Sequence, residues 1–387
     1  MNYEVSVVRC EEYDDEKVRA AIEECLKPLG GMQSVVKNGS RVLVKPNLLS
    51  AKKPEEATTT HPSVVKAVVR LVQEQGGVPV IGDSPGGRNT SSAVKSLMKT
   101  TGMQAVADET GCEIVSFEEP VVDVTSDAAR IYKKFTIAKA VKDADVVIGL
   151  PKLKTHQLTY YTGAVKLLYG YIPGIMKSEN HLHTGKDPKL FAELLLDLHE
   201  MRRPDLTIMD AVVGMEGRGP SAGNPKQIGL VMASKSCTAL DFVATSAVGM
   251  EPLTIPTVAG ASERGVGPKN MGEIELFGPD LASVMVRDFK KAETMDMSRV
   301  PAVVLNLATS MIASKPKIDP QKCKKCGVCA RDCPPRAMTF VKGRVPAIDY
   351  KVCIRCYCCQ ELCPENAVRV HLPVARKALN RLTGRNR

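Results

Sequence analysis

Short apolar runs alternate with amphipathic helical patterns through the first 314 residues of the chain. Runs of Val, Ile and Leu are typical of strands buried on both faces, and apolar residues repeating every three to four positions are typical of helices. The alternation predicts an α/β domain with a mostly parallel, helix-covered sheet. The predicted strands are Glu4–Val8, Arg41–Lys45, Val78–Gly82, Glu113–Phe117, Asp145–Leu150, Leu206–Met209 and Ile228–Ala233.

The ends of the helical patterns carry residues that favour helix boundaries. Pro62 stands at the first position of one such pattern, and the glycine pair Gly76-Gly77 follows its last residue. Proline is tolerated in the first helical turn, and glycine commonly ends a helix. The predicted helices are Pro62–Gln75, Thr90–Thr100, Lys189–Met201 and Thr238–Val248.

A different pattern, an internal repeat, fills the C-terminal part of the chain. The segment CKKCGVCARDCP begins at Cys323, and CIRCYCCQELCP begins at Cys353, 30 residues later. The same offset relates Ile318-Asp319 to Ile348-Asp349. The repeat divides the chain into an α/β domain at 1–314, a cysteine-rich domain at 315–372 and a basic tail at 373–387, where a short amphipathic helix is expected to pack on its own domain.

Both repeats fit the C-x2-C-x2-C-x3-C-P run that ligates [4Fe–4S] clusters, in which the fourth Cys ligates the other cluster. Nine of the 13 cysteines lie between Cys323 and Cys363. The spacing does not match the paired knuckles of zinc sites, and a disulfide framework would need an oxidising compartment. Cys358 is predicted to be a thiol that points away from the clusters, the alternative being a further ligand. The predicted ligands are Cys323, Cys326, Cys329 and Cys363 for one cluster, and Cys353, Cys356, Cys359 and Cys333 for the second.

Residues 315–372 resemble a bacterial-type 2[4Fe–4S] ferredoxin domain. The resemblance implies a small α+β module of βαββαβ type, with two clusters that each carry one electron at low potential. Residues 315–387 hold 17 Lys and Arg against 5 Asp and Glu, whereas residues 1–314 hold 36 against 38. This basic charge predicts an acidic electron donor such as ferredoxin or flavodoxin, because complementary charge speeds and orients encounter. In the alternative interpretation the charge only keeps the module soluble.

Polar side chains follow several of the predicted strands. Ligands of open α/β sheets bind outside the carboxyl ends of the strands, so these side chains are expected to converge. Two Lys and a His occupy what the pattern presents as one short loop after Asp145–Leu150, and an Asp closes Leu206–Met209. The predicted substrate-binding residues are Lys45, Asn47, Ser84, Lys152, Lys154, Lys166 and Asp210, and the predicted proton donors are His156 and Asp83.

Five short segments follow one another along the α/β domain: KPN at Lys45–Asn47, TTHP at Thr59–Pro62, GDSPGG at Gly82–Gly87, PKLKTH at Pro151–His156 and TGAVK at Thr162–Lys166. Their order resembles the DUF362 family, whose members are often fused to a ferredoxin module and have no established general activity. One departure is that Leu167 stands where many members have Asn, so the substrate of this chain is open.

These observations predict a ferredoxin-type reductase, in which two [4Fe–4S] clusters relay electrons to an anionic small molecule bound by the α/β domain. The alternatives are a non-enzymatic electron-transfer protein and a cofactor-maturation factor. A further organic cofactor and the oligomeric state are not specified by the sequence.

Several other classes are disfavoured. The chain lacks a P-loop, an early Rossmann fingerprint and a nucleophile elbow. Aromatic residues make up 4% of it, which leaves few platforms for nucleic-acid bases. The longest uncharged stretch, Val300–Ser314, is too short to span a membrane, and no signal peptide precedes the first strand. A cytoplasmic location is therefore expected. His181 and His183 form a weak candidate metal pair, with surface histidines as the default interpretation.

Overall fold

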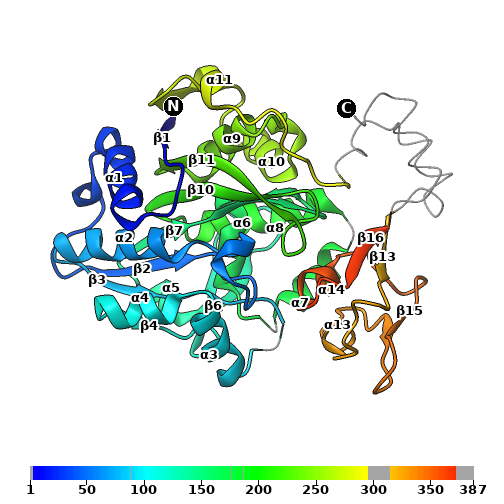
Figure 1. The fold of residues 1–387 in the computed structure, drawn as a ribbon. Helices are drawn as coiled ribbons and strands as arrows, with labels where there is room; N and C mark the ends of the chain where they lie inside the picture. Colours follow the sequence, from blue (N-terminus) through cyan, green and yellow to red (C-terminus); the bar gives the residue numbers. More distant parts are fainter. Residues whose placement is uncertain (1–2, 88, 175, 186, 295–313, 372–387) are drawn as a thin grey trace.

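The computed structural model describes residues 3–87, 89–174, 176–185, 187–294 and 314–371. A ten-stranded sheet forms its centre, in the order β12-β1-β11-β10-β7-β2-β3-β4, with β8 paired to β10 and β9 paired to β8 (Figure 1). Neighbours from β10 to β4 are parallel, and β11 is antiparallel to both of its neighbours. The strands are β1 (Tyr3–Arg9), β2 (Arg41–Pro46), β3 (Val78–Ile81), β4 (Glu113–Ile114), β7 (Val146–Leu150), β8 (Lys152–His156), β9 (Tyr160–Thr162), β10 (Leu206–Glu216), β11 (Asn224–Ser234) and β12 (Ile274–Phe277). A separate hairpin pairs β5 (Val121–Thr125) with β6 (Lys134–Ala138).

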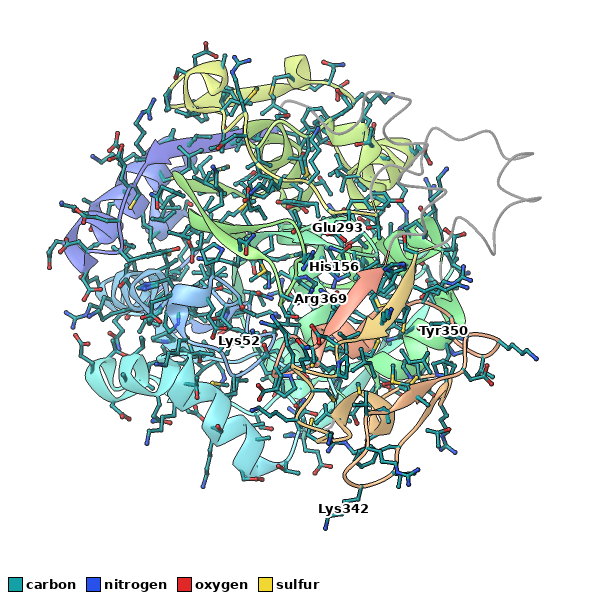
Figure 2. The ribbon with its side chains drawn as sticks, turned by 45° about the vertical axis from the view of Figure 1, so that its right-hand side comes forward. Lys52, His156, Glu293, Lys342, Tyr350 and Arg369 are labelled. Carbon is teal, nitrogen blue, oxygen red and sulfur yellow. The ribbon has the colours of Figure 1, made fainter. Side chains whose placement is uncertain are left out.

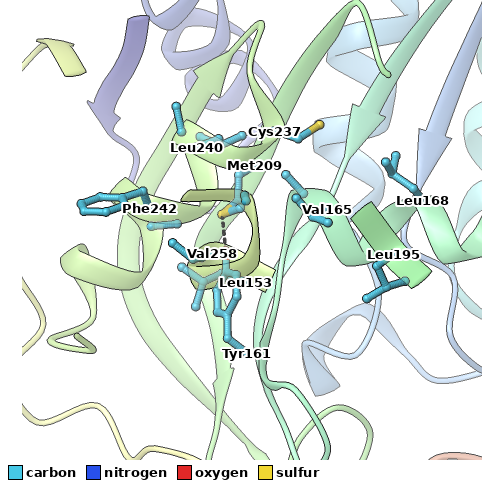
Figure 3. Close-up of a cluster of buried hydrophobic side chains, with 14 of the residues drawn as sticks. Leu153, Tyr161, Val165, Leu168, Leu195, Met209, Cys237, Leu240, Phe242 and Val258 are labelled. Carbon is cyan, nitrogen blue, oxygen red and sulfur yellow. Dashed lines mark hydrogen bonds between the residues drawn. The ribbon is translucent and has the colours of Figure 1, made fainter. Parts of the chain in front are cut away.

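Each face of the sheet carries its own hydrophobic core. In β2, Leu43 belongs to one core while Val42 and Val44 belong to the other, because successive side chains of a strand point to opposite faces. Helices α1, α2 and α4 pack on the Val42 side, and α6, α8, α9 and α10 pack on the Leu43 side. On the latter side the Tyr161 hydroxyl donates to Met209 Sδ at 3.7 Å (Figure 3).

The predicted α/β class is therefore confirmed, with a mostly parallel central sheet between layers of helices. Of the predicted strands, Glu113–Phe117 is shortened to β4, and the four predicted helices agree with the structure to within two residues at each end. Seven helices of the described sheet domain were not predicted, namely α1, α4, α5, α6, α7, α10 and α11. The helices are α1 (Asp15–Leu26), α2 (Pro62–Glu74), α3 (Ser91–Thr100), α4 (Met103–Thr110), α5 (Lys139–Asp143), α6 (Ala164–Leu167), α7 (Lys177–Thr184), α8 (Pro188–Met201), α9 (Cys237–Ala247), α10 (Pro256–Arg264) and α11 (Leu281–Val284).

Two strands differ from the prediction in a way that changes the site. The PKLKTH segment, expected as a loop, is the strand β8, which pairs with β10 and β9. Asp210, expected at a strand end, lies inside β10, which runs on to Glu216 before the chain turns into β11. Because β8 is a strand, Lys152, Lys154 and His156 stand two residues apart and share one face.

The cysteine-rich region forms a small unit beside α7 and the carboxyl ends of the central strands (Figure 1). Its pairs are β13 with β16 and β14 with β15. Lys52 Nζ donates to Asn366 Oδ1 at 3.0 Å and Gln360 Nε2 donates to the Arg218 carbonyl at 2.8 Å, which joins the unit to the sheet domain. The predicted tail helix lies outside the described residues. The elements are β13 (Lys315–Ile318), α13 (Val328–Arg331), β14 (Met338–Thr339), β15 (Ala347–Ile348), α14 (Cys358–Glu361) and β16 (Val368–His371).

Candidate functional site

A cleft lies between the carboxyl ends of β2 and β3 and the helix α14 of the cysteine-rich unit. Its enclosed volume is about 80 Å³. The sheet domain contributes Asp83, Ser84 and Lys166 to its wall, and the cysteine-rich unit contributes Cys358 and Glu361. The two parts of the chain therefore build one site together.

One ion pair closes the sheet side of the cleft. Lys45 Nζ, at the end of β2, donates to Asp83 Oδ1 at 2.6 Å, and both side chains are buried. The other oxygen of Asp83 accepts from the Leu48 amide at 2.7 Å. Burial lowers the pKa of the Lys45 ammonium, which the Asp83 carboxylate partly offsets. Because Asp83 accepts two strong hydrogen bonds, its carboxylate is held in place.

Two further lysines line the cleft without a carboxylate partner among the described residues. Lys177 Nζ donates to the carbonyls of Ser84 at 2.5 Å and Pro85 at 3.2 Å. Lys166 Nζ lies 5.6 Å from the Tyr169 ring centre and 5.7 Å from that of Phe191. Carbonyls and aromatic faces stabilise a cation, but they do not neutralise it. The cleft wall therefore carries two lysine amines that no described carboxylate pairs with.

Burial lowers the pKa of the Lys177 ammonium to about 7, with Asp83 and Glu118 acting against this shift and Lys45 and Lys166 adding to it. The unfolded chain keeps this proton to about pH 10, so between pH 7 and pH 10 the unfolded state binds more protons than the folded state. The free energy of unfolding should then rise with pH in this window, by at most about 1.4 kcal/mol per pH unit for this residue.

Chemical denaturation of the protein and of a Lys177→Met variant at pH 7 and pH 9 checks this expectation. The variant should show a smaller rise in unfolding free energy between the two pH values. An identical rise in both proteins would show that Lys177 does not titrate in this window.

His156 joins the sheet domain to the cysteine-rich unit. It is fully buried, and its Nε2 lies 3.1 Å from Glu361 Oε1. Its Nδ1 accepts from the Leu158 and Thr159 amides at 3.0 and 3.2 Å, which places the proton of the neutral ring on Nε2. Burial lowers the pKa of His156 to about 4, with the positive charge of Lys166 as the next cause. At neutral pH His156 therefore faces Glu361 as an uncharged ring. Figure 2 labels His156 among the side chains of the molecule.

Lys152 and Asp210 bind each other instead of lining the cleft. Lys152 Nζ lies 2.9 Å from Asp210 Oδ2, and neither side chain is exposed. Tyr13 joins them, accepting from Lys152 at 2.6 Å and donating to Asp210 Oδ1 at 2.7 Å, and it stacks on His61. The reason is that β8 and β10 are paired there, with Asp210 opposite Lys152 in the register. In this buried cluster Lys152 and Asp210, both predicted substrate ligands, pair with each other and with Tyr13.

The remaining predicted residues lie close to the cleft. Lys154 Nζ donates at 2.7 Å to both Asn47 Oδ1 and the Thr58 carbonyl, and burial lowers its pKa to about 7. Asn47 lines the cleft, with its oxygen engaged by Lys154. Ser84 Oγ donates to Glu118 Oε1 at 2.7 Å, which leaves its carbonyl for Lys177. The structure thus brings Asn47, Asp83, Ser84 and Lys166 to the cleft wall, with Lys45 and Lys154 bonded directly to two of them.

The predicted ligands of the first cluster surround one small hollow. Cys323, Cys326, Cys329 and Cys363 all line it. Backbone amides already face two of these sulfurs, at 3.4 Å from Lys325 N to Cys323 Sγ and 3.2 Å from Ala367 N to Cys363 Sγ. Amide hydrogen bonds to sulfur are a recognised determinant of cluster potential.

Members of the second set of predicted ligands lie close enough to influence one another's charge. Burial raises the pKa of the Cys333 thiol, and the charges of Cys356 and Cys353 raise it further. The nine cysteines of this region could hold iron–sulfur clusters. In the described residues no three His, Cys, Asp or Glu side chains are arranged around a single metal ion. A cuboidal cluster spreads its four thiolates over separate corners, so the donor set suits a cluster better than one ion.

Cys358 is buried and lines the cleft. We expect a Cys358→Ala variant to keep the full iron content of the protein, because the other eight cysteines supply two complete sets of four thiolates. Iron and sulfide analysis of the anaerobically purified variant measures this. A loss of about four irons would instead make Cys358 a ligand.

Sequence reasoning missed Lys177, Tyr169 and Glu361, and it undervalued His181. His181 is buried on α7, whereas His183 is exposed, so the two do not face one ion. Lys177 and His181 stand four residues apart and share one face of this helix. That spacing was the available signal, but the pattern of α7 is too polar to be recognised as a buried helix.

One family profile matches within the sheet domain. The profile of the family described as "Domain of unknown function (DUF362)" matches residues 42–246. The chain is 39% identical over 264 residues to "Thylakoid-associated protein sll1697" of Synechocystis sp. (strain ATCC 27184 / PCC 6803 / Kazusa), an alignment that covers 68% of this chain and 80% of that relative. The family match ends before the cysteine-rich region. Within the described residues no helix is long and apolar enough to cross a membrane.

Among solved structures, the lactate racemase apoprotein from Thermoanaerobacterium thermosaccharolyticum aligns with a TM-score of 0.39 and 14% identity. The alignment covers 59% of this chain and 53% of that one, so it spans about half the length of the solved structure.

Proposed function

We propose that this chain, which belongs to the DUF362 family, is an iron–sulfur reductase that acts on a small anionic molecule held in the cleft under α14. The observation that carries the proposal is the composition of the cleft wall. Lys166 and Lys177 come from the sheet domain, and Cys358 comes from the segment between two predicted cluster ligands, Cys356 and Cys359. A substrate in this cleft would lie beside both the positive charges and the predicted source of electrons.

Two [4Fe–4S] clusters, when bound, would supply one electron each, and a substrate carbonyl or alkene takes up these two electrons together with two protons. The sheet domain would bind and orient the anion through Lys166. Lys177 is better suited than His156 to provide a proton, because its pKa is about 7 and it lines the cleft. His156 instead faces Glu361. Asp83, the other predicted proton donor, holds Lys45 in place.

The exposed edge of the cysteine-rich unit is the proposed entry point for electrons. Cys326 is exposed, and the neighbouring Lys324 and Lys325 are exposed as well. The partner is a small acidic one-electron carrier of the ferredoxin or flavodoxin type, since opposite charges speed encounter. Electrons would enter at the set that contains Cys326 and leave near the buried Cys356, which borders α14. The cytoplasmic location remains part of this proposal, and the relative's name associates that protein with thylakoids.

The experiment that tests the function starts from protein purified without oxygen. Small molecules released on denaturation are identified by mass spectrometry, and the protein, reduced with dithionite and freed of excess reductant, is mixed with 2-oxo acids, 2-enoic acids, nitrite and sulfite. Reoxidation by one of these anions, followed in the visible spectrum with the reduced product quantified, supports a reductase. If none of them reoxidises the protein while an acidic ferredoxin does, the chain is an electron carrier.

A further inference from the structure

Two polar groups in the cleft have no partner that accounts for them. His181 is 4% exposed, and its fully buried Nδ1 has no hydrogen-bond partner among the described residues. Lys166 Nζ makes no hydrogen bond or ion pair within the same residues; only aromatic rings lie close to it. A buried polar atom without a partner costs about 1–3 kcal/mol, so His181 Nδ1 calls for an explanation, whereas Lys166 is half-buried at the cleft wall.

His181 and the Lys166 ammonium lie beside the same two aromatic rings. The His181 ring stacks on Phe191 with its centre 4.8 Å away, and Lys166 lies over the same Phe191 ring. Tyr169 meets His181 edge-on at 5.7 Å and also carries the Lys166 ammonium over its face. Both residues line the cleft. The shared rings therefore hold an amine and an imidazole nitrogen around the same space.

The charges around this space leave it electropositive. Lys154, Lys166 and Lys177 have no carboxylate within ion-pair distance among the described residues, and the Lys45 charge is taken up by Asp83. Of the carboxylates that line the cleft besides Asp83, Asp332 is paired with Arg331, and Glu361 faces His156. The three lysine amines have no carboxylate of their own, so an anion supplied from outside the chain would stabilise their charged forms.

The size of the space limits what that anion can be. A water molecule needs roughly 10–15 Å³ of such volume, so about 80 Å³ holds on the order of six waters or one molecule of a few heavy atoms. Leu167 and Leu362 add apolar surface to the wall, and the Cys358 thiol closes it from the α14 side. A carboxylate or phosphate matches this volume better than a nucleotide or an aromatic acid does.

We propose that the cleft binds a small oxyanion, of carboxylate or phosphate size, between the Lys166 ammonium and His181 Nδ1, beneath Cys358. This deepens the proposed function, since it takes the cleft as the substrate site and specifies the class of molecule that enters it. His181 in its Nδ1-protonated neutral form donates one hydrogen bond, and Lys166 supplies the charge. Because α14 forms one wall, the site is complete only when the cysteine-rich unit is docked on the sheet domain.

Calorimetric titration of the full-length protein, purified without oxygen, tests the inference with sodium acetate, inorganic phosphate and sodium benzoate. Acetate or phosphate should bind with a stoichiometry of one, and benzoate should bind much more weakly. Comparing the affinities for acetate and phosphate shows whether the site prefers a planar carboxylate or a tetrahedral phosphate. Lys166→Met should lower the affinity for the preferred anion about tenfold or more, because a hydrogen bond from a charged group is lost. His181→Phe, which keeps the stack on Phe191, should weaken it by a smaller factor.

Matched control variants distinguish binding in the cleft from nonspecific attraction of anions to positive surface charge. Lys189→Met and His183→Phe change exposed residues near α7 and should leave the affinity unchanged. Binding that Lys166→Met does not weaken, or benzoate binding as strong as acetate binding, would overturn the inference.

One competing role for Lys166 is to balance the negative charge of a nearby cluster. In that case Lys166→Met would shift the reduction potential of the protein and leave anion affinity intact, which a redox titration of the same variant detects. The binding site and the proposed reductase reaction are tested separately. If an anion binds through Lys166 but does not reoxidise the reduced protein, the binding site is supported and the reductase reaction is refuted.

Discussion

The Cys326→Ala and Cys356→Ala variants are each expected to contain about four irons and four sulfides per chain, against about eight of each in the unchanged protein. The two cysteines belong to different predicted sets of four ligands. Cys326 lines the hollow formed with Cys323, Cys329 and Cys363. Removing one thiolate leaves that cluster with three ligands while the other set is intact. Iron and sulfide analysis, together with the spectrum of the dithionite-reduced protein, measures the loss.

The control for this prediction is a cysteine outside the repeat. Cys10 lies at the end of β1, where its thiol donates to the Glu12 carbonyl, and Cys10→Ala should keep the full iron content. Stoichiometric zinc without sulfide in the unchanged protein would refute the cluster assignment. Full iron in either Cys326→Ala or Cys356→Ala would refute the ligand sets.

Lys152→Ala is expected to lower the free energy of unfolding by about 3–5 kcal/mol, the cost of leaving a buried charge without its partner. Asp210 would lose its ion-pair partner, and Tyr13 would lose the ammonium that donates to its hydroxyl. Water does not reach either charge, because both side chains are fully buried. Chemical denaturation compared with the unchanged protein gives the difference.

Two further variants make the test specific. Lys142→Ala, on the exposed side of α5, should change the unfolding free energy by less than about 0.5 kcal/mol. The double variant Lys152→Met with Asp210→Leu should recover much of the loss, because it removes both charges together. If Lys152→Ala were as stable as the unchanged protein and weakened only anion binding, Lys152 would be a substrate ligand as the sequence pattern suggested.

The sequence by itself determined the elements that depend on local spacing. Val42, Leu43 and Val44 identify a strand buried on both faces, and Pro62 with Gly76-Gly77 marks both ends of α2. The cysteine repeat also predicted that Cys323, Cys326, Cys329 and Cys363 belong together, and these four line one hollow, while the assignment of both sets as cluster ligands stays a prediction. Such features are readable because each is set by residues near one another in the chain.

Tertiary structure decided which polar side chains meet. Whether Lys152 bonds a substrate or Asp210 depends on the register of β8 against β10, and pairing between strands 58 residues apart leaves no mark in local spacing. The same holds for Glu361, which reaches His156 because α14 docks on the sheet edge. Lys177 and His181 became visible as site residues because packing buries a helix whose sequence is polar. Burial and long-range pairing arise from the fold as a whole, and they determine which of many lysines and histidines face the cleft.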